Sequence, residues 1–260
     1  MNANSFRRSL AATAALALGP CLTAQEDLGA SKEFLPRLQV WTDVAVGKLE
    51  HDTSGTNLDG DDSAVMLELG VEGFGETGFG GGVRLGFLGS DEGLFDDAGV
   101  EDVMAAAVDL YLHISQRWSE DRFSLPLRFG LLVNSYGLEQ ETSLGTETVQ
   151  FDTIGFRTEL EPEFLLSDWD GAVLTAGSRL SLGSGWTNCS TDPSTVEADS
   201  SMLLYGIDLG LRIRAGMGSF HLGWAWRGQS MDESDVEGGV FYRGFDENFS
   251  GFVIGGGLVF

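Results

Sequence analysis

Apolar and polar residues alternate along most of the chain after residue 36. Val65, Leu67, Leu69 and Val71 are apolar at every second position, Gly75-Glu76-Thr77-Gly78 reads as a tight turn, and the alternation resumes from Phe79 to Phe87. Successive side chains of an extended strand point to opposite faces. The stretch therefore predicts a β-hairpin with one apolar face and one face of glycine and charge.

The same two-residue period returns along the chain and predicts ten strands. Each has about 9–11 residues, the length that crosses a bilayer at a tilt of about 45°. Gly239–Phe245 could form another strand or lengthen its neighbours, so eight or twelve strands are alternatives. Besides the hairpin, the expected strands are Leu38–Val46, Ala106–Ile114, Phe123–Val133, Ile154–Phe164, Leu174–Leu182, Leu203–Ile213, Phe220–Trp226 and Phe249–Phe260.

The links between these strands alternate in length. Short links are expected at 75–78, 115–122, 167–171 and 215–219, and long acidic links at 50–62, 89–102, 135–149, 184–200 and 229–248. Ten strands with both chain ends on the short-link side predict an all-β fold, a closed antiparallel up-and-down transmembrane β-barrel. A soluble sandwich also alternates, but its solvent face should be rich in lysine, and Lys32 and Lys48 are the only lysines here.

The first 24 residues have the pattern of a secretory signal peptide. Arg7 and Arg8 precede an apolar stretch from about Leu10 to Leu22, and Leu22-Thr23-Ala24 forms an acceptable cleavage site. A buried N-terminal helix is the alternative, and Pro20 fits a lipoprotein box at Cys21 poorly. The expected organisation is a signal peptide at 1–24, a short extension at 25–35 and the barrel at 36–260.

Aromatic residues gather near the ends of the expected strands, as in the girdles of outer-membrane barrels. The chain also ends on an apolar alternation, with Phe252, Ile254, Leu258 and Phe260 on one face. The expected girdle residues are Phe74, Phe79, Trp118, Phe123, Phe164, Trp169, Phe220 and Phe260 near the short links, and Phe87, Tyr136, Phe151, Trp186 and Trp226 near the long links.

With its signal peptide, alternating links and terminal Phe260, the sequence resembles the outer-membrane β-barrel proteins of diderm bacteria, of porin-like or small-barrel architecture. The resemblance covers about residues 36–260. It implies a location in the outer membrane and contact with outer-membrane lipid. It also implies that the four C-terminal apolar residues are recognised by the outer-membrane assembly machinery.

The face opposite the apolar one carries charged residues that a barrel would turn inward. Arginine suits such a place because its planar fork can bridge two carboxylates. Nearly balanced charges predict a packed ionic network; a narrow pore lined by the same residues is the alternative, because ten strands enclose a narrow lumen. The inward set is Glu68, Glu72, Arg84, Asp109, Arg128, Arg157, Glu159, Glu161, Arg179, Asp208, Arg212, Arg214 and Arg227.

The whole chain is strongly acidic, with a net charge of −25, and the long links carry many of the acids. Loss of residues 1–24 removes two arginines and no acid, which makes the charge about −27 and excludes nucleic-acid binding. If these acids gather at one rim, they would attract cations to a pore. Alternatively, they belong to solvated loops without a specific ligand, or they bind divalent cations. In Asn57–Asp62, Asp62 replaces the glycine that a calcium loop requires, so no specific metal site and no cofactor are expected.

Two functions of different classes follow: a narrow cation-favouring pore for small solutes, and a non-conducting structural or surface-interaction barrel. Some ten-stranded outer-membrane barrels are proteases that use acids and a histidine at the outer rim. Here His51 lies beside Asp52 in an expected outer loop without a second acidic motif, and His113 and His221 are expected near the periplasmic end. GxSxG and HExxH motifs are absent, so catalysis is not expected.

Three remaining residues carry local predictions. Cys189 is the single cysteine after residue 24, which predicts an inert loop thiol or an intermolecular disulfide. Pro126 and Pro162 should lie at similar depth on neighbouring strands, and neither can donate a ladder hydrogen bond. A bulge or an interrupted ladder is therefore expected there, near the periplasmic rim.

Overall fold

A computed structural model gives the fold of most of the chain. It describes residues 37–55, 59–96, 99–100, 102–120, 122–142, 145–169, 171–192, 197–235 and 241–260. The predicted signal peptide at 1–24, the extension at 25–35 and the first residues of Asn57–Asp62 lie outside these ranges. No helix in the described part is long and apolar enough to cross a membrane.

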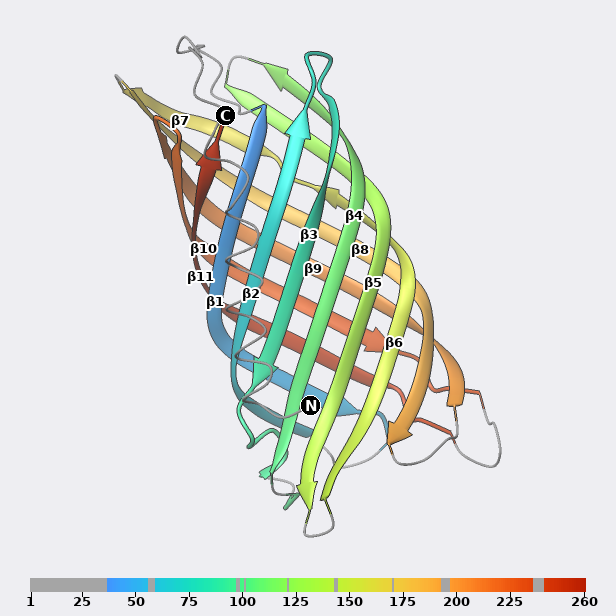
Figure 1. The fold of residues 1–260 in the computed structure, drawn as a ribbon. Helices are drawn as coiled ribbons and strands as arrows, with labels where there is room; N and C mark the ends of the chain where they lie inside the picture. Colours follow the sequence, from blue (N-terminus) through green and yellow to red (C-terminus); the bar gives the residue numbers. More distant parts are fainter. Residues whose placement is uncertain are drawn as a thin grey trace. The chain divides into compact units, whose positions relative to one another are not determined.

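Eleven β-strands account for nearly all of the described chain (Figure 1). They are β1 (Leu38–Thr53), β2 (Asp59–Phe74), β3 (Phe79–Ser90), β4 (Val103–Glu120), β5 (Phe123–Thr142), β6 (Gly145–Leu160), β7 (Glu163–Trp169), β8 (Ala172–Asp192), β9 (Glu197–Ala215), β10 (Gly218–Met231) and β11 (Phe245–Val259).

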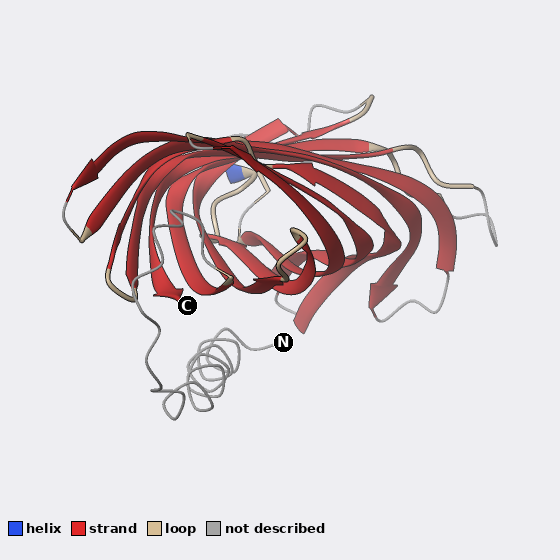
Figure 2. Ribbon diagram, turned by 90° about the horizontal axis from the view of Figure 1, so that it is seen from above, coloured by secondary structure: helices blue, strands red, loops and turns tan. Residues whose placement is uncertain are grey.

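Antiparallel pairing joins consecutive strands into a closed barrel (Figure 2). β1 pairs with β2 on one side and with β11 on the other, which removes both sheet edges. The short β7 pairs with β5 and β8, the same neighbours as β6, so β6 and β7 are two pieces of one barrel strand. The predicted fold class, a ten-stranded antiparallel up-and-down barrel, is confirmed.

The break between β6 and β7 falls at the predicted prolines. The ladder with β5 stops at Leu127↔Leu160 and resumes at Ser124↔Glu163 in the same register, so Pro126 and Pro162 lie in the gap. One backbone bond, from Glu161 N to Pro126 O at 3.0 Å, remains there. On its other side Pro126 still pairs with Arg117. The predicted interruption is therefore confirmed on the side that the two prolines share.

The C-terminal strand closes the barrel as the sequence predicted. Pairing runs from Gln39↔Val259 to Thr53↔Phe245, and Phe260 N donates to Leu38 O at 2.8 Å. Gly255 of this strand makes room for a neighbouring side chain, because a Cβ there would collide with the Asp43 carboxylate on β1.

The strands are longer than predicted and contain most of the expected long links. β1, β5 and β8 continue to Thr53, Thr142 and Asp192. Along these strands the outward face changes from apolar to polar, and the inward face becomes apolar. On β1, Val44 and Val46 face outward near the middle of the barrel, whereas Lys48 and Glu50 face outward beyond them and Leu49 is buried. The parts of these strands nearest the long links, drawn at the bottom of Figure 1, therefore form an extension with a polar outer surface. We call this end of the barrel the upper end and the short-link end the lower end, the reverse of their places in Figure 1.

The outer surface of the lower barrel is apolar on every strand. A belt of exposed Val, Leu, Ile, Phe and Trp side chains includes Val46, Leu112, Phe129, Ile154, Leu182, Leu209, Leu222 and Phe252. Trp118, Phe164 and Trp169 are exposed near the short links, and Trp186 near the extension, as the girdle prediction required. Phe74, Tyr136 and Phe151 were wrongly expected in the girdles, because their side chains are buried.

Candidate functional site

All thirteen predicted inward residues take part in ion pairs inside the barrel. They come from β2 to β6, from the link after β6, and from β8 to β10, so the closed sheet brings together positions up to 159 residues apart. Every inward position of a strand meets the same enclosed space, and seven arginines there need carboxylate partners. The network has three clusters, which follow one another toward the short-link end.

Glu68 is the centre of the first cluster and is almost fully buried. Its carboxylate accepts hydrogen bonds from Arg179 Nη1 at 2.6 Å and Arg227 Nη1 at 2.8 Å, and Arg84 Nε lies 3.4 Å away. The first two arginines also bind Asp208, through Arg179 Nε at 2.6 Å and Arg227 Nη2 at 2.8 Å. Two guanidinium groups therefore share the same two carboxylates.

The second cluster is built on a bidentate pair. Arg128 donates from Nε and Nη2 to the two oxygens of Glu72, both at 2.6 Å. His113 Nε2 is 3.1 Å from one of these oxygens, and Gln39 donates to the other at 3.1 Å. Charge-assisted bidentate bonds are among the strongest in proteins, and at most 1% of either charged residue is exposed.

The third cluster lies toward the short-link end and is centred on Glu163. Arg214 Nη2 contacts its two oxygens at 2.7 and 2.9 Å, and Thr175 donates to it at 2.5 Å. Arg212 bridges Glu163 and Glu161 at 3.8 and 3.5 Å.

Further ion pairs join the clusters. Glu161 reaches Arg128 Nη1 at 2.7 Å, and Arg84 Nη1 reaches Glu159 at 2.7 Å. Arg157 pairs with Asp109 at 2.6 Å. The packed ionic network expected from the sequence is thus present along the lumen of the lower barrel.

The predicted set omits four ionisable residues that the structure places in the same space. Asp43 and His221 face each other at 3.5 Å, His113 binds Glu72, and Glu163 centres the third cluster. The alternation was sufficient to find them. Asp43 lies two residues before the inward-facing Ala45 and so faces the same side of β1. Glu163 continues the inward-facing positions 157, 159 and 161 beyond the interruption.

Above the ionic clusters the lumen is filled by an apolar core. The rings of Tyr136 and Phe245 contact each other at a tilt of 33°, with centroids 5.3 Å apart, and the fully buried Leu49 belongs to the same cluster. Leu94 and Phe95, from the link between β3 and β4, also belong to this core. The core begins at belt level with Ala45 and Val253 and continues through the barrel extension, where its side chains fill the lumen beyond the belt.

His51 and Cys189 belong to this apolar core rather than to outer loops, which corrects both predictions. His51 Nδ1 lies 3.2 Å from the Tyr136 hydroxyl and 3.5 Å from Glu247, and only 3% of the residue is exposed. Burial raises the pKa of Tyr136 well above its usual range, so that hydroxyl stays protonated. Burial likewise raises the pKa of the Cys189 thiol to about 11.

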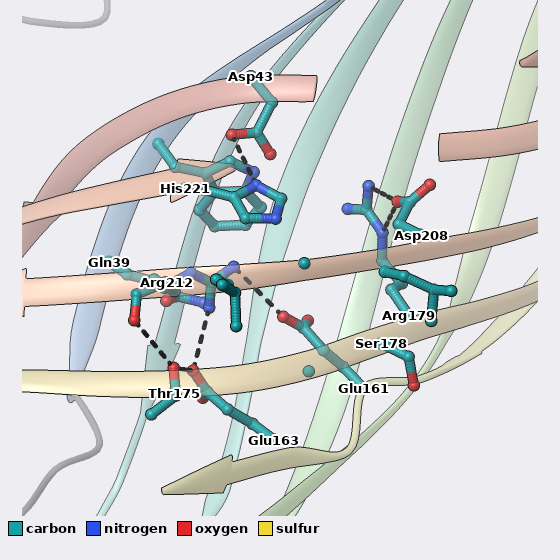
Figure 3. Close-up of a pocket in the computed structure, with 15 residues that line it drawn as sticks. Gln39, Asp43, Glu161, Glu163, Thr175, Ser178, Arg179, Asp208, Arg212 and His221 are labelled. Atoms are coloured by element: carbon teal, nitrogen blue, oxygen red, sulfur yellow. Dashed lines mark hydrogen bonds and ion pairs between the residues drawn. The ribbon is translucent and has the colours of Figure 1, made fainter. Parts of the chain in front are cut away.

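Two cavities interrupt the filling. One of about 100 Å³ lies between the ionic clusters and the apolar core and is lined by Arg84, Asp109 and Arg157 among others. A smaller one of about 40 Å³ lies toward the short-link end, where Asp43, Glu161 and His221 project into it (Figure 3). Arg179 lines both cavities and stands between them.

The outer rim contains an open acidic hollow of about 650 Å³, lined by Asp62, Asp91, Glu92, Asp96 and Asp102. These acids come from β2 and from the link between β3 and β4. Within the described ranges, no group of three His, Cys, Asp or Glu side chains has an arrangement that could hold a metal ion.

Comparison with known proteins agrees with the fold. No protein-family model matches the chain, and no curated protein matches it. Among solved structures, the outer-membrane protease OmpT from Escherichia coli is 12% identical, with a TM-score of 0.54, and the match covers 85% of this chain and 97% of that one. The β domain of the Bordetella autotransporter BrkA is 15% identical over 86% and 100% of the two chains, with a TM-score of 0.42.

The chain therefore has the fold of the outer-membrane β-barrels, as the sequence pattern predicted. The closed barrel and its apolar outer belt place the chain in the outer membrane. At this low identity the similarity concerns the fold, and the activity has to be argued from the residues of this chain.

Proposed function

We propose that the protein is a non-conducting outer-membrane barrel that holds an acidic, rigid extension above the membrane. One observation carries this proposal: the lumen is filled twice, by ion-paired side chains at membrane level and by an apolar core in the extension. An ion crossing the barrel would have to separate buried charge pairs and then enter an apolar region, and both steps are costly.

The extension supports a role in surface interaction. Its outward positions carry mainly acids and small polar residues, for example Glu50, Asp61, Asp152, Asp199 and Asp246, and its inner face is packed like a soluble domain. Such a surface attracts cations and repels anions. Divalent cations or a positively charged partner are the proposed ligands of the rim. The C-terminal residues Phe252, Ile254, Leu258 and Phe260 are the proposed contact with the assembly machinery.

The narrow cation-favouring pore is the second candidate, and the cavity of about 100 Å³ is the observation that favours it. A protease is not proposed, although OmpT shares the fold. His51, the histidine nearest the rim, is enclosed by Phe95 and Phe245 and is out of reach of a peptide.

Single-channel recording in planar bilayers tests the proposal. The detergent-folded protein, with folding confirmed on an unboiled gel, should give no conductance steps, while an established porin inserted in the same way serves as the positive control. Reproducible steps that scale with the amount of folded protein would overturn the proposal. Cation selectivity of such steps would then establish the pore.

A further inference from the structure

The two cavities of the lumen have one lining residue in common, Arg179. The guanidinium of Arg179 contacts Glu68 and Asp208 and lines both spaces. In Figure 3, Arg179 from β8 and Asp208 from β9 lie to one side of the smaller cavity, Arg212 projects from another position of β9, and Glu161 projects from the link after β6. Displacement of the Arg179 side chain would therefore extend one cavity toward the other.

The larger cavity has the properties of a water-filled chamber. Arg84 Nη2 and Arg157 Nε are buried donors without a hydrogen-bond partner in the protein, and Asp109 Oδ1, Asn134 Oδ1 and Glu159 Oε2 are buried acceptors without one. All five residues line this cavity. Its volume of about 100 Å³ admits several water molecules, which could satisfy these donors and acceptors.

Arg227 duplicates the carboxylate contacts of Arg179. Arg227 binds Glu68 at 2.8 Å and Asp208 at 2.8 Å, and Arg84 lies 3.4 Å from Glu68. Both carboxylates therefore keep a cationic partner when Arg179 moves. Removing one member of a buried pair is costly mainly because the remaining charge is left alone, and that penalty is reduced here.

A destination for the displaced guanidinium is also present. The smaller cavity is lined by the acids Asp43, Glu161 and Glu163. Glu161 is paired with Arg128 and Arg212, and Glu163 is paired with Arg212 and Arg214. Within 4.0 Å, Asp43 has His221 as its ionic contact. An arginine that turns into this cavity would find carboxylates and would leave an opening behind it.

We propose that the larger cavity is a hydrated chamber for water and small polar solutes, and that Arg179 is its gate toward the short-link end. The gate leads to a dead end, because the apolar core closes the chamber on the other side. This proposal rests on the proposed function, in which the apolar core closes the lumen at the extension. It adds an entrance to the lumen from the short-link end.

Thiol labelling can test the gate. Ser181 lines the larger cavity and is half-buried, so Ser181→Cys places a reporter in the chamber, while the native Cys189 reports on the apolar core. The probe is methyl methanethiosulfonate, a small neutral thiol reagent, applied to folded protein without residues 1–24. Modification of each cysteine is followed by mass spectrometry after digestion.

Arg179→Ala in the Ser181→Cys protein should speed labelling at position 181 by tenfold or more. Arg227→Ala is the matched control: it removes an arginine of the same cluster, but it leaves Arg179 as the partner that both carboxylates need. Labelling should then be unchanged or slower. Equal acceleration by both substitutions, or none by Arg179→Ala, would overturn the gate.

Folding and the outer closure are checked in the same samples. If Arg179→Ala fails to give the folded band on an unboiled gel, Arg179→Gln replaces it with the same expected direction. Cys189 should stay unmodified throughout. Labelling of Cys189 together with conductance of the unsubstituted protein would refute the closed lumen, whereas failure of the Arg179 effect alone would refute only the gate.

Discussion

The membrane-level half of the barrel and the extension above it use one continuous sheet in opposite ways. In the lower half, apolar side chains face outward and ion pairs fill the lumen; in the extension, acids face outward and Leu49, Tyr136 and Phe245 fill it. In both halves the backbone hydrogen bonds of a strand are made with its neighbouring strands, as between β1 and β11. The surroundings, lipid or water, thus decide which face of a strand is apolar, and the two halves should fail in different ways.

The largest effect is expected from unpairing a charge in the lower half. Arg128→Ala removes both bonds to buried Glu72 and should lower the free energy of unfolding by about 3–5 kcal/mol. Urea titration in micelles, read by heat-modifiable gel mobility, measures the change. Replacing both residues, by Arg128→Leu with Glu72→Leu, should recover much of the loss. If the double substitution is no better than the single one, the unpaired Glu72 carboxylate is not the cause of the defect.

A cavity in the extension should have a somewhat smaller and more local effect. Leu49→Ala removes a fully buried side chain from the apolar core and should cost about 2–4 kcal/mol. Hydrogen exchange should accelerate in the upper parts of β1 and β11, with little change near Thr42. Val46→Ala, on the exposed belt of the same strand, is the control. Uniform acceleration along β1 would mean that the two halves unfold together.

Deleting Phe260 should affect assembly more than the stability of either half. The deletion removes the bond from its N–H to Leu38 and the bonds that its carbonyl accepts from Arg37 and Leu38. We expect a several-fold lower level of folded protein in the outer membrane, measured by fractionation and immunoblot. Met217→Ala, at an exposed site near the short-link end, should leave that level unchanged. Equal levels of the two variants would contradict a special role for the terminal residue.

The smallest effect is expected on the surface of the extension. A hydrogen bond with Asp59, together with the repulsion between the two carboxylates, raises the pKa of Asp52. The folded protein therefore binds this proton more tightly than the unfolded chain, and the site loses stability as the pH rises through the raised pKa. Asp52→Asn should raise the unfolding midpoint at pH 7, and the gain should shrink as the pH falls toward 4. A gain that is independent of pH would exclude this repulsion as its cause.

Much of the lower half could be predicted from the sequence because one physical rule applies to every strand. Strict alternation gave the strand positions, the inward parity of all thirteen charged residues and the closure by β11. The partners could not be predicted, since Arg84 meets Glu159 across 75 residues through the curvature of the barrel.

The extension was missed because its alternation reverses. Lys48, Glu50 and Asp52 occupy the outward positions that valines occupy below, so the acidic stretch looked like a loop. Its apolar positions, such as Leu49 and Phe151, looked isolated or like girdle residues. Only the folded sheet brings them together in one core.

The interruption between β6 and β7 gives the barrel wall an uneven stiffness. Within the described part of the chain, β6 and β7 lose their ladders with both β5 and β8 between Leu160 and Glu163, so the wall can flex around Pro162 without breaking a full set of ladder bonds. Glu161 is mounted on this compliant segment, and it is one of the acids that would receive Arg179. Arg179 lies on the neighbouring strand β8, between the pairs Leu160↔Leu180 and Glu163↔Gly177 that border the interruption. A small outward movement of the backbone there would therefore favour release of the Arg179 side chain.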